Sequence, residues 1–289
     1  MANAIELFKK YATKLDEVYK LASCTSDLDG DTTLVRAGAN TNEIVIPVLD
    51  MDGLADYSRN DGYVKGSANL TMESVKFNYD RGRKFGVDAM DNEETAGLAF
   101  GRLSSEFVRT KVVPEMDAFR FATYAAKDGI SKASGDLTDG VAVLEALVTA
   151  MSDMDESEVP EEERYLKITP TLLNAVQAVD SYKSKEILNR FASVKRVPQS
   201  RFYTAITLLD GKADDELAGG YTKAADAKDI NFMIFHKPAL LQYPKHTVNK
   251  IITPEANQES DGYLAFYRAY GLADVYKNKT AGIYLHHKA

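Results

Sequence analysis

The feature that most constrains the fold of this chain is the segment VKFNYDRGRKFGVDAMDNEETAG, residues 75–97. Its first half alternates apolar with polar or charged side chains, which is the pattern of a β-strand with one covered face. The charge then changes from basic in RGRK to acidic in DAMDNEE, and the acidic residues open an amphipathic helix. The segment therefore predicts a long strand that passes directly into a helix. The expected covered face carries Val75, Phe77, Tyr79, Phe85 and Val87.

This strand is expected to return from a long hairpin. The preceding run EIVIPVLDM indicates a strand, in which Pro47 favours an edge position or a bulge because proline cannot donate to a ladder. Residues 54–90 then predict a long two-stranded excursion. Before Ser74 the apolar residues Leu70 and Met72 lie in the other phase, which indicates either a bulge or a change of packing partner along the ribbon.

The predicted hairpin needs a cover for its apolar side chains. An isolated hairpin is at best marginally stable in water, yet this one carries many large apolar residues, including Tyr57, Tyr63 and Val64. The body of the same chain could cover them, in which case the charges of the ribbon are simply solvated. The surface of a neighbouring molecule is the other possible cover, and the residues alone leave both open.

A long helix is predicted from Asp91 or Asn92 to about Lys127. Glu93 and Glu94 lie favourably at its positive N-terminal end. We expect a kink or a restart at Pro114, because proline removes a backbone donor. Before the hairpin, residues 5–19 show the apolar period of another helix, followed by a polar loop.

A compact α/β region is predicted after a break of small residues at 129–140. VAVLEALVTAM indicates a helix, RYLKIT a short strand, and PTLLNAVQAV a helix with proline in its first turn. From Ile230 to the end, strands dominate. The fold class expected from this order of elements is α+β.

Composition and net charge disfavour or exclude several classes of function and site. The formal net charge of −8 disfavours a surface that wraps tightly around nucleic acid, although a container that holds nucleic acid without gripping it is compatible with it. Cys24 is the only cysteine, so an intrachain disulfide and thiolate-rich zinc sites are excluded. The N-terminal segment lacks the apolar core of a signal peptide, and no segment is apolar enough to span a membrane. We expect a soluble protein that folds in a reducing cytoplasm.

We expect no catalytic, cofactor-binding or metal-binding residues. Asp27, Asp29 and Asp31 have calcium-loop spacing, but the required glycine does not follow Asp31, and Gly38 stands where the bidentate glutamate belongs. Cys24 has no histidine near it in sequence, and no phosphate-binding loop or dinucleotide fingerprint is present. The histidines are interpreted as structural or surface residues: His236, His246, His286 and His287.

The order of elements resembles the major capsid proteins of tailed bacteriophages, which have the Hong Kong 97 fold. The most specific parts are FNYDRGRKFGVDAMDNEET leading into the helix, KVVPEMDAFRF, and the closing LADVYKNKTAGIYL. The resemblance covers essentially the whole chain. It implies an N-terminal arm at 1–42, an extended loop built as a long β-hairpin at 43–90, a peripheral domain with a long spine helix at 91–135 and 230–276, and an axial α/β domain at 136–229 and 277–289.

The resemblance also implies a function and partners. Copies of the chain would form pentamers and hexamers in an icosahedral shell that encloses double-stranded DNA without reading its sequence. A separate scaffolding protein, a portal and decoration proteins are the expected partners, and the location is the virion, assembled in the host bacterial cytoplasm. In that family the hairpin lies over an adjacent subunit, so charges of the ribbon and of the following helix would pair across the boundary. The candidate inter-subunit contacts are Tyr57, Tyr63, Lys65, Phe77, Tyr79, Arg81, Arg83, Lys84, Asp91, Glu93, Glu94, Arg196 and Arg201.

Covalent welding of the shell is not expected. Some capsids of this family join a loop lysine to an asparagine through an isopeptide bond that a buried glutamate promotes. Lys65 could supply the amine, but Asp261 falls where the asparagine belongs and Arg268 where the glutamate belongs. A carboxylate is a poor acyl donor and arginine cannot accept the proton. Asn257 is a nearby substitute that still lacks an evident base.

Two other functions stay open at this point. An encapsulin-type nanocompartment has a similar fold and encloses cargo enzymes, whereas the long hairpin and the preceding arm favour the phage head. A monomeric α/β enzyme or binding protein would need a pocket with convergent polar groups, and the sequence offers no such constellation.

Overall fold

The computed structural model describes residues 22–30, 36–37, 43–60, 62–94, 103–179 and 181–289. The predicted helix at 5–19 lies outside them. The strands are β1 Arg36–Ala37, β2 Glu43–Met51, β3 Ala68–Lys76, β4 Tyr79–Asp88, β5 Ser131–Ser134, β6 Arg164–Ile168, β7 Ser193–Arg196, β8 Ile206–Leu209, β9 Gly220–Lys223, β10 Ile230–His236, β11 Leu240–Ile252, β12 Gly262–Val275 and β13 Ile283–His287. The helices are α1 Ala89–Glu94, α3 Leu103–Phe107, the π-helical turn η3 Val108–Val112, α4 Val113–Ala125, α5 Gly140–Glu156, α6 Pro170–Val179 and α7 Ser181–Asn189.

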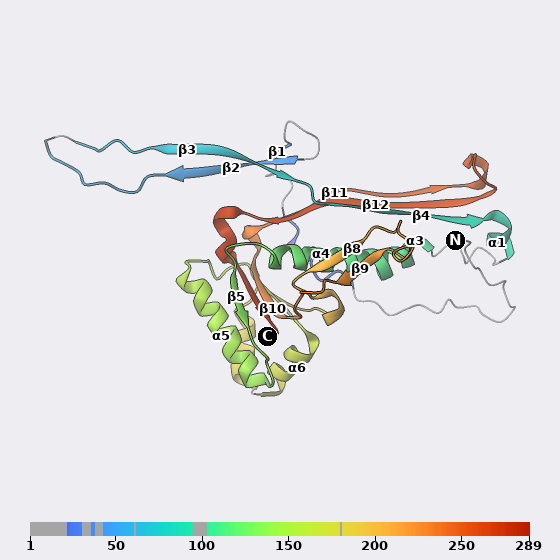
Figure 1. Cartoon of the computed structure of the whole chain (residues 1–289). Helices are drawn as coiled ribbons and strands as arrows, with labels where there is room; N and C mark the ends of the chain where they lie inside the picture. The colour runs from blue at the N-terminus through green and yellow to red at the C-terminus, as the bar shows by residue number, and fades with distance from the viewer. Residues whose placement is uncertain (1–21, 31–35, 38–42, 61, 95–102, 180) are drawn as a thin grey trace.

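Strands β2 and β3 form a hairpin that projects far from the body, here called the ribbon (residues 43–76; Figure 1). Their antiparallel register runs without a shift from Glu43 opposite Lys76 to Met51 opposite Ala68. The alternative of a bulge within this pair is therefore wrong. The change of phase marks a change of packing partner instead, because Leu70 and Met72 are exposed, whereas Val75 and Phe77 pack on the body beside Leu241, Tyr243 and Leu272.

The chain leaves the ribbon at Asn78, so the expected hairpin through residue 90 is wrong. Strand β4 pairs with β12 and not with β2, and β12 pairs with β11 to complete a three-stranded antiparallel layer, the upper sheet. Between β3 and β4, where the chain passes from the ribbon to the upper sheet, the side chain of Asn78 takes the place of a backbone hydrogen-bond partner. Its Nδ2 donates to the carbonyl of Ala273 at 2.7 Å and its Oδ1 accepts from the Ala273 N–H at 3.1 Å. Strands β3 and β4 have the same alternating pattern, which does not reveal their different partners.

The spine helix (α3, η3 and α4) runs beneath the upper sheet (Figure 1). Aromatic side chains join the two layers: the rings of Phe85 and Phe107 lie 4.7 Å apart, and those of Tyr79 and Phe119 lie 5.0 Å apart. The predicted irregularity at Pro114 takes the form of the π-helical turn that precedes α4, in which Pro114 occupies the tolerated first turn. The described residues do not connect α1 to α3, so one continuous helix from residue 91 stays a prediction.

The lower sheet has five strands in the order β5-β13-β10-β6-β7. Helices α5 and α6 bury apolar side chains such as Leu147 and Val176 against one face of it, where Phe232 and Ile234 lie. The spine helix covers the other face with Phe121. Strands β5 and β10 therefore share a sheet with β6 and β13, whereas the predicted domain division had assigned residues 131–134 and 230–236 to the peripheral domain. The buried run INFMIF has the composition of a central strand, which serves either domain equally.

A small hairpin, β8–β9, lies against the spine helix and under β4 (Figure 1). Its loop is tied to the upper sheet because the Arg83 guanidinium donates to the carbonyl of Leu217 at 2.8 Å. This hairpin encloses a cleft beneath β4, which is described below.

Candidate assembly surfaces

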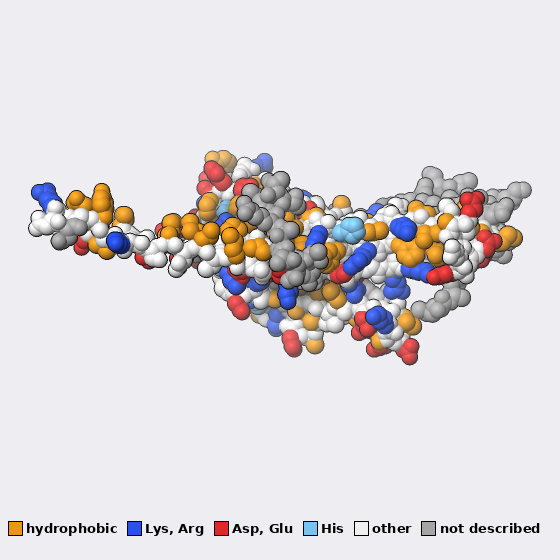
Figure 2. Space-filling model, turned by 90° about the horizontal axis from the view of Figure 1, so that it is seen from above, with side chains coloured by type: hydrophobic (Ala, Val, Ile, Leu, Met, Phe, Trp, Pro, Cys, Tyr) orange, Lys and Arg blue, Asp and Glu red, His pale blue; other side chains and the backbone are white. Residues whose placement is uncertain are grey.

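The ribbon exposes large apolar side chains along its length. Leu54 at its far end is as exposed as in an extended peptide, and Tyr63 is 89% exposed. The Tyr57 and Tyr63 rings lie 4.9 Å apart and form an aromatic pair at the tip. Figure 2 shows these apolar side chains on the thin projecting part of the molecule. A contiguous exposed apolar strip of this kind is typical of a protein interaction surface. The other exposed members are Leu49, Met51, Val64, Leu70 and Met72.

Among the predicted contact residues of the ribbon, Tyr57, Tyr63 and Lys65 are exposed. Phe77 lies at the root, partly buried, with its ring 4.9 Å from Tyr270 and 4.4 Å from the Lys245 ammonium. Phe77 thus contacts its own chain, while the first three side chains are available to a neighbour. Their inter-subunit role stays a prediction.

Three of the predicted contacts on β4 have side-chain partners within the chain: Tyr79, Arg81 and Lys84. Tyr79 is buried and donates to Glu115 at 3.2 Å, so a contact with a neighbour through this side chain is wrong. Burial, together with the nearby Glu115 carboxylate, raises the pKa of Tyr79. Arg81 forms an ion pair with Glu115 at 2.8 Å, and Lys84 forms one with Glu259 at 2.9 Å.

Arg201 is also buried, and its predicted role as a surface contact is wrong. Its guanidinium donates to the fully buried Asp117 at 3.0 Å. Arg196, on the edge strand β7, is exposed, and Asp91 is partly exposed on α1. The side chains of the remaining predicted contacts, Glu93 and Glu94, lie outside the described residues.

Asp117 is the centre of a buried polar cluster that sequence reasoning missed. Besides Arg201, it accepts from Ser23 Oγ at 2.8 Å, the Cys24 N–H at 2.9 Å and Thr25 Oγ1 at 2.7 Å. Four donors around one carboxylate compensate for its removal from water. We call this cluster the clasp, because it holds the arm segment 23–29 against the spine helix. Its other members are Asp27, Asp29, Arg120, Lys167 and Gln242.

The clasp also accounts for two aspartates of the run that has calcium-loop spacing, while the third, Asp31, lies outside the described residues. Asp27 accepts from the buried Lys167 at 2.7 Å through both carboxylate oxygens, and Lys195 adds a second cation at 3.3 Å. Asp29 accepts from Gln242 at 2.7 Å and lies 3.4 Å from Arg120. These carboxylates bind cationic side chains of three elements, and no cluster of metal-ligating residues occurs in the described part of the chain.

Cys24 and His286 are both buried in the subunit. Cys24 is buried, and burial with the nearby Asp117 charge raises its pKa to about 11, which disfavours a reactive thiolate. His286 is buried against Phe232, and its Nδ1 lies 3.0 Å from Asn231 Nδ2. Across the described residues, no helix is long and apolar enough to cross a membrane.

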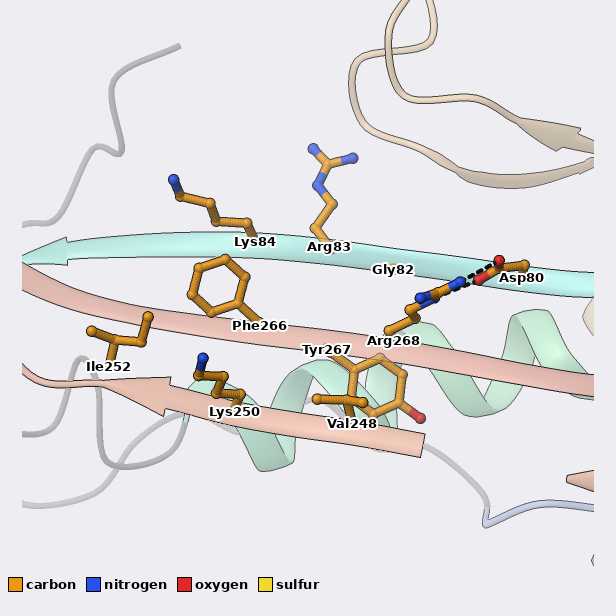
Figure 3. A pocket seen from close by; sticks show the side chains of 10 residues that line it. All are labelled: Asp80, Gly82, Arg83, Lys84, Val248, Lys250, Ile252, Phe266, Tyr267 and Arg268. Carbon is orange, nitrogen blue, oxygen red and sulfur yellow. Dashed lines mark hydrogen bonds and ion pairs between the residues drawn. The ribbon is translucent and has the colours of Figure 1, made fainter. Parts of the chain in front are cut away.

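The upper sheet carries a shallow hollow with cationic and apolar walls (Figure 3). The Arg268 guanidinium binds Asp80 with two bonds of 2.7 and 2.6 Å, which hold the pKa of that carboxyl below its usual range. Lys250 has no carboxylate within ion-pair distance among the described residues. The apolar part of the wall is formed by Val248, Ile252 and Phe266.

Comparison with known proteins identifies the fold. No protein-family model and no curated protein sequence matches the chain. A chain of Mycobacterium phage Che8 is similar in structure with a TM-score of 0.67 at 12% identity, over 99% of this chain and 98% of that one. A chain of the mature capsid of bacteriophage PhiM1 has a TM-score of 0.65 at 10% identity, over 99% and 92% of the two chains. A chain of a virus-like particle from Pyrococcus furiosus is similar with a TM-score of 0.52 at 13% identity, over 85% and 86%.

These similarities extend over nearly the whole chain in the two phage proteins. The protein therefore has the α+β fold of tailed-phage capsid proteins, the Hong Kong 97-type fold that the sequence resemblance implies. At this level of identity the likeness defines the fold and leaves the function to the surfaces described above.

Proposed function

We propose that the protein is a major capsid protein, which self-assembles into an icosahedral shell around double-stranded phage DNA. The observation that carries the proposal is the outer part of the ribbon, from Leu49 to Met72, whose large apolar side chains are exposed in the described part of the chain. A neighbouring subunit is the cover that a capsid fold supplies. The full-length similarity to phage proteins supports the same function.

The placement of the two surfaces favours a head-to-tail contact. The ribbon leaves the body at one end, and the hollow of the upper sheet lies at the other end (Figure 1, Figure 3). The ribbon carries the exposed carboxylates Asp50, Asp52 and Asp56, and the hollow offers Lys250 beside an apolar wall. Two different surfaces of one molecule form a heterologous interface, which closes into rings such as pentamers and hexamers.

The finer parts of the function belong to the same proposal. The arm, the extended loop, the peripheral domain and the axial domain keep the roles that the resemblance implies, with β5 and β10 moved to the axial sheet. A separate scaffolding protein, a portal and decoration proteins act with the shell in the host cytoplasm. The net charge of −8 suits a wall that encloses DNA without sequence-specific binding.

A second function is a nanocompartment of the encapsulin type. The similarity to the Pyrococcus furiosus virus-like particle favours it, with a lower TM-score and a smaller share of the chain than the phage proteins have. The content of the particle distinguishes the two functions, since a phage head packages DNA and a nanocompartment holds a protein cargo.

Assembly is tested directly by electron microscopy and light scattering of the purified full chain over a range of protein and salt concentrations. Expression alone and together with the scaffolding, portal and packaging proteins of its own genome extends the test. We expect rings or closed shells, and nuclease-protected DNA when the packaging proteins are present. A compact monomer under every condition would contradict the proposal, and shells filled with an enzyme would favour the nanocompartment.

A further inference from the structure

A cleft lies beneath β4, outside the surfaces discussed so far. It has a volume of about 680 Å³ and lies between β4, the π-helical turn of the spine helix and the β8–β9 hairpin. A hollow of this size accommodates several side chains of a partner. Its walls combine aromatic rings and cations, among them Phe107, Tyr203, Tyr221, Arg83 and Lys111.

Two of the cations in the cleft lack an anionic partner. Arg81 is neutralised by Glu115, and Lys223 forms an ion pair with Asp229 at 2.7 Å. Arg83, in contrast, donates only to the carbonyl of Leu217, and Lys111 is exposed at the π-helical turn. Among the described residues, no carboxylate lies within ion-pair distance of Arg83 or Lys111. The lining also carries the carboxylates Asp80, Glu115 and Asp210, so its four cations exceed its carboxylates by one formal positive charge.

The matching negative charge lies on the turn that follows α5, residues 156–163, here called the acidic turn. Glu156, Glu158 and Glu162 are exposed, and no cation of the described chain forms an ion pair with them. Their neighbour Glu161 differs, because it pairs with Arg190 at 2.5 Å. Glu163 is exposed and forms no ion pair, like the first three, so the acidic turn presents four carboxylates that form no ion pair within the described chain.

Buried Arg164 holds the acidic turn in a fixed shape. Its Nε donates to the carbonyl of Pro160 at 2.9 Å, a second nitrogen donates to the carbonyl of Val159, and the guanidinium pairs with Asp155 at 2.7 Å. The backbone of the turn is therefore wrapped around one cation, with the glutamates directed outward. A preformed turn loses little conformational entropy when it docks.

The cleft and the acidic turn lie on opposite flanks of the molecule. In Figure 1, α5 lies on the side from which the ribbon projects, whereas β8 and β9 lie under the other end of the upper sheet, with the lower sheet and α4 between them. The two surfaces of one copy are therefore oriented toward different neighbours. In a head-to-tail ring, the flank that carries the ribbon and the acidic turn faces the flank of the next copy that carries the hollow and the cleft.

We propose that the acidic turn of one subunit docks at the cleft of the next subunit, with glutamates of the turn paired to Lys111 and Arg83. The occupant of the cleft is thus a second copy of this chain. The inference rests on the proposed shell function, and it adds a polar contact under the ribbon to the apolar contact that the ribbon makes. Complementary charges at such a contact fix the register of the neighbours and speed their association.

A charge exchange tests the pairing in full-length protein. Lys111→Glu and Glu162→Lys each place like charges opposite each other, so each should slow shell assembly by roughly tenfold at low salt. The double variant restores opposite charges and should assemble within about threefold of the wild-type rate. Lys185→Glu, an exposed lysine on α7 away from the cleft, is the matched control. If the two substitutions instead acted independently, so that the double variant assembled more slowly than either single variant, the inference would be overturned.

Cross-linking of wild-type particles gives a second measurement that needs no substitution. Shells assembled from a mixture of isotope-labelled and unlabelled subunits are treated with a carbodiimide, which joins a lysine to a carboxylate that it contacts. Mass spectrometry should find Lys111 joined to a peptide of the acidic turn, with mixed labels that mark two different copies. Shells in which Lys111 is joined only to other carboxylates would overturn the inference while leaving the proposed function intact. Failure of the wild type to form shells would instead refute the proposed function.

Discussion

The ribbon and the clasp depart from the usual distribution of side chains in opposite directions. The ribbon exposes Leu54 and Tyr63 to solvent, whereas the clasp buries Asp117, Arg201 and Lys167. Burial of a charge is tolerated only when partners compensate for lost hydration, and the clasp supplies them within the chain. The apolar ribbon has no such compensation in the described part of its own chain. The clasp therefore stabilises the folded subunit, whereas the exposed part of the ribbon contacts another molecule under the proposed function.

Removal of the ribbon gives the largest expected effect. Replacement of residues 52–67 by a short Gly-Ser connection deletes the exposed tip and leaves β4 in the upper sheet. We expect assembly to be abolished and the subunit to stay folded, because the deleted residues contribute little to any buried cluster. Circular dichroism and electron microscopy measure the two outcomes. Loss of the folded state would show that the ribbon, like the clasp, stabilises its own subunit.

Loss of the Asp117 carboxylate should instead lower the stability of the subunit itself. Asp117→Ala leaves Arg201 buried without its carboxylate and removes the acceptor of the arm segment. Breaking a buried pair on one side costs about 3–5 kcal/mol of stability. Urea unfolding of unassembled subunits measures the change, with Asp128→Ala in the exposed turn after the same helix as the control. If Asp117→Ala matched this control, the clasp would not stabilise the subunit.

A smaller effect is expected from a second buried polar group, His286. Burial lowers its pKa below the ordinary value of a histidine, so the neutral ring is favoured in the folded state. The unfolded chain then binds the proton first as the pH falls, and the stability contributed by His286 is present above pH 6.5 and is lost as the pH falls below it. Denaturant unfolding between pH 7.5 and 5.5 measures the slope. His286→Gln should flatten it, and His236, whose pKa burial also lowers, should account for the rest. An unchanged slope in His286→Gln would contradict the assignment.

Substitution of Lys65 is expected to leave the covalent structure of the particles unchanged, because we expect no covalent links between subunits. Arg268 stands at the position of the base, and its guanidinium, held by Asp80, cannot accept a proton. Asn257, the substitute acyl partner, donates its amide to Ser260 and to the carbonyl of Gly262. Mature particles boiled in detergent should run as single subunits, and Lys65→Arg particles should run identically. A ladder of covalent oligomers that resists reductant and disappears in Lys65→Arg would refute this prediction.

Periodicity predicted the local elements well and their partners poorly. The strand at 43–51, the helices at 140–156 and 170–179 and the final strand follow from apolar spacing alone. The partner of β4 does not, because its alternating face suits a hairpin and a sheet equally. The resemblance to phage capsid proteins indicated the Hong Kong 97-type fold but kept β4 in a hairpin at 43–90, so the pairing of β4 with β12 is seen only in the structure.

The clasp could not be predicted from the sequence either, for a different reason. Polar runs such as SDLD and KRVPQSR normally lie in solvent, and only long-range contacts with Asp117 and Lys167 bury their charges. Their signal in the sequence was the density of opposite charges in two segments far apart. That density does not reveal which segments meet.

The position of Asn78 between the ribbon and the upper sheet has a mechanical consequence. A strand rises about 3.3 Å per residue, so the ribbon from Asn60 to Lys76 is a lever arm of roughly 50 Å with its fulcrum at the root. A rotation of about 5° at that fulcrum moves the tip by roughly 4 Å. The two hydrogen bonds between Asn78 and Ala273 tie the fulcrum to β12. Torque applied at the tip therefore reaches the upper sheet through the Asn78 amide together with the packed side chains of Val75 and Phe77.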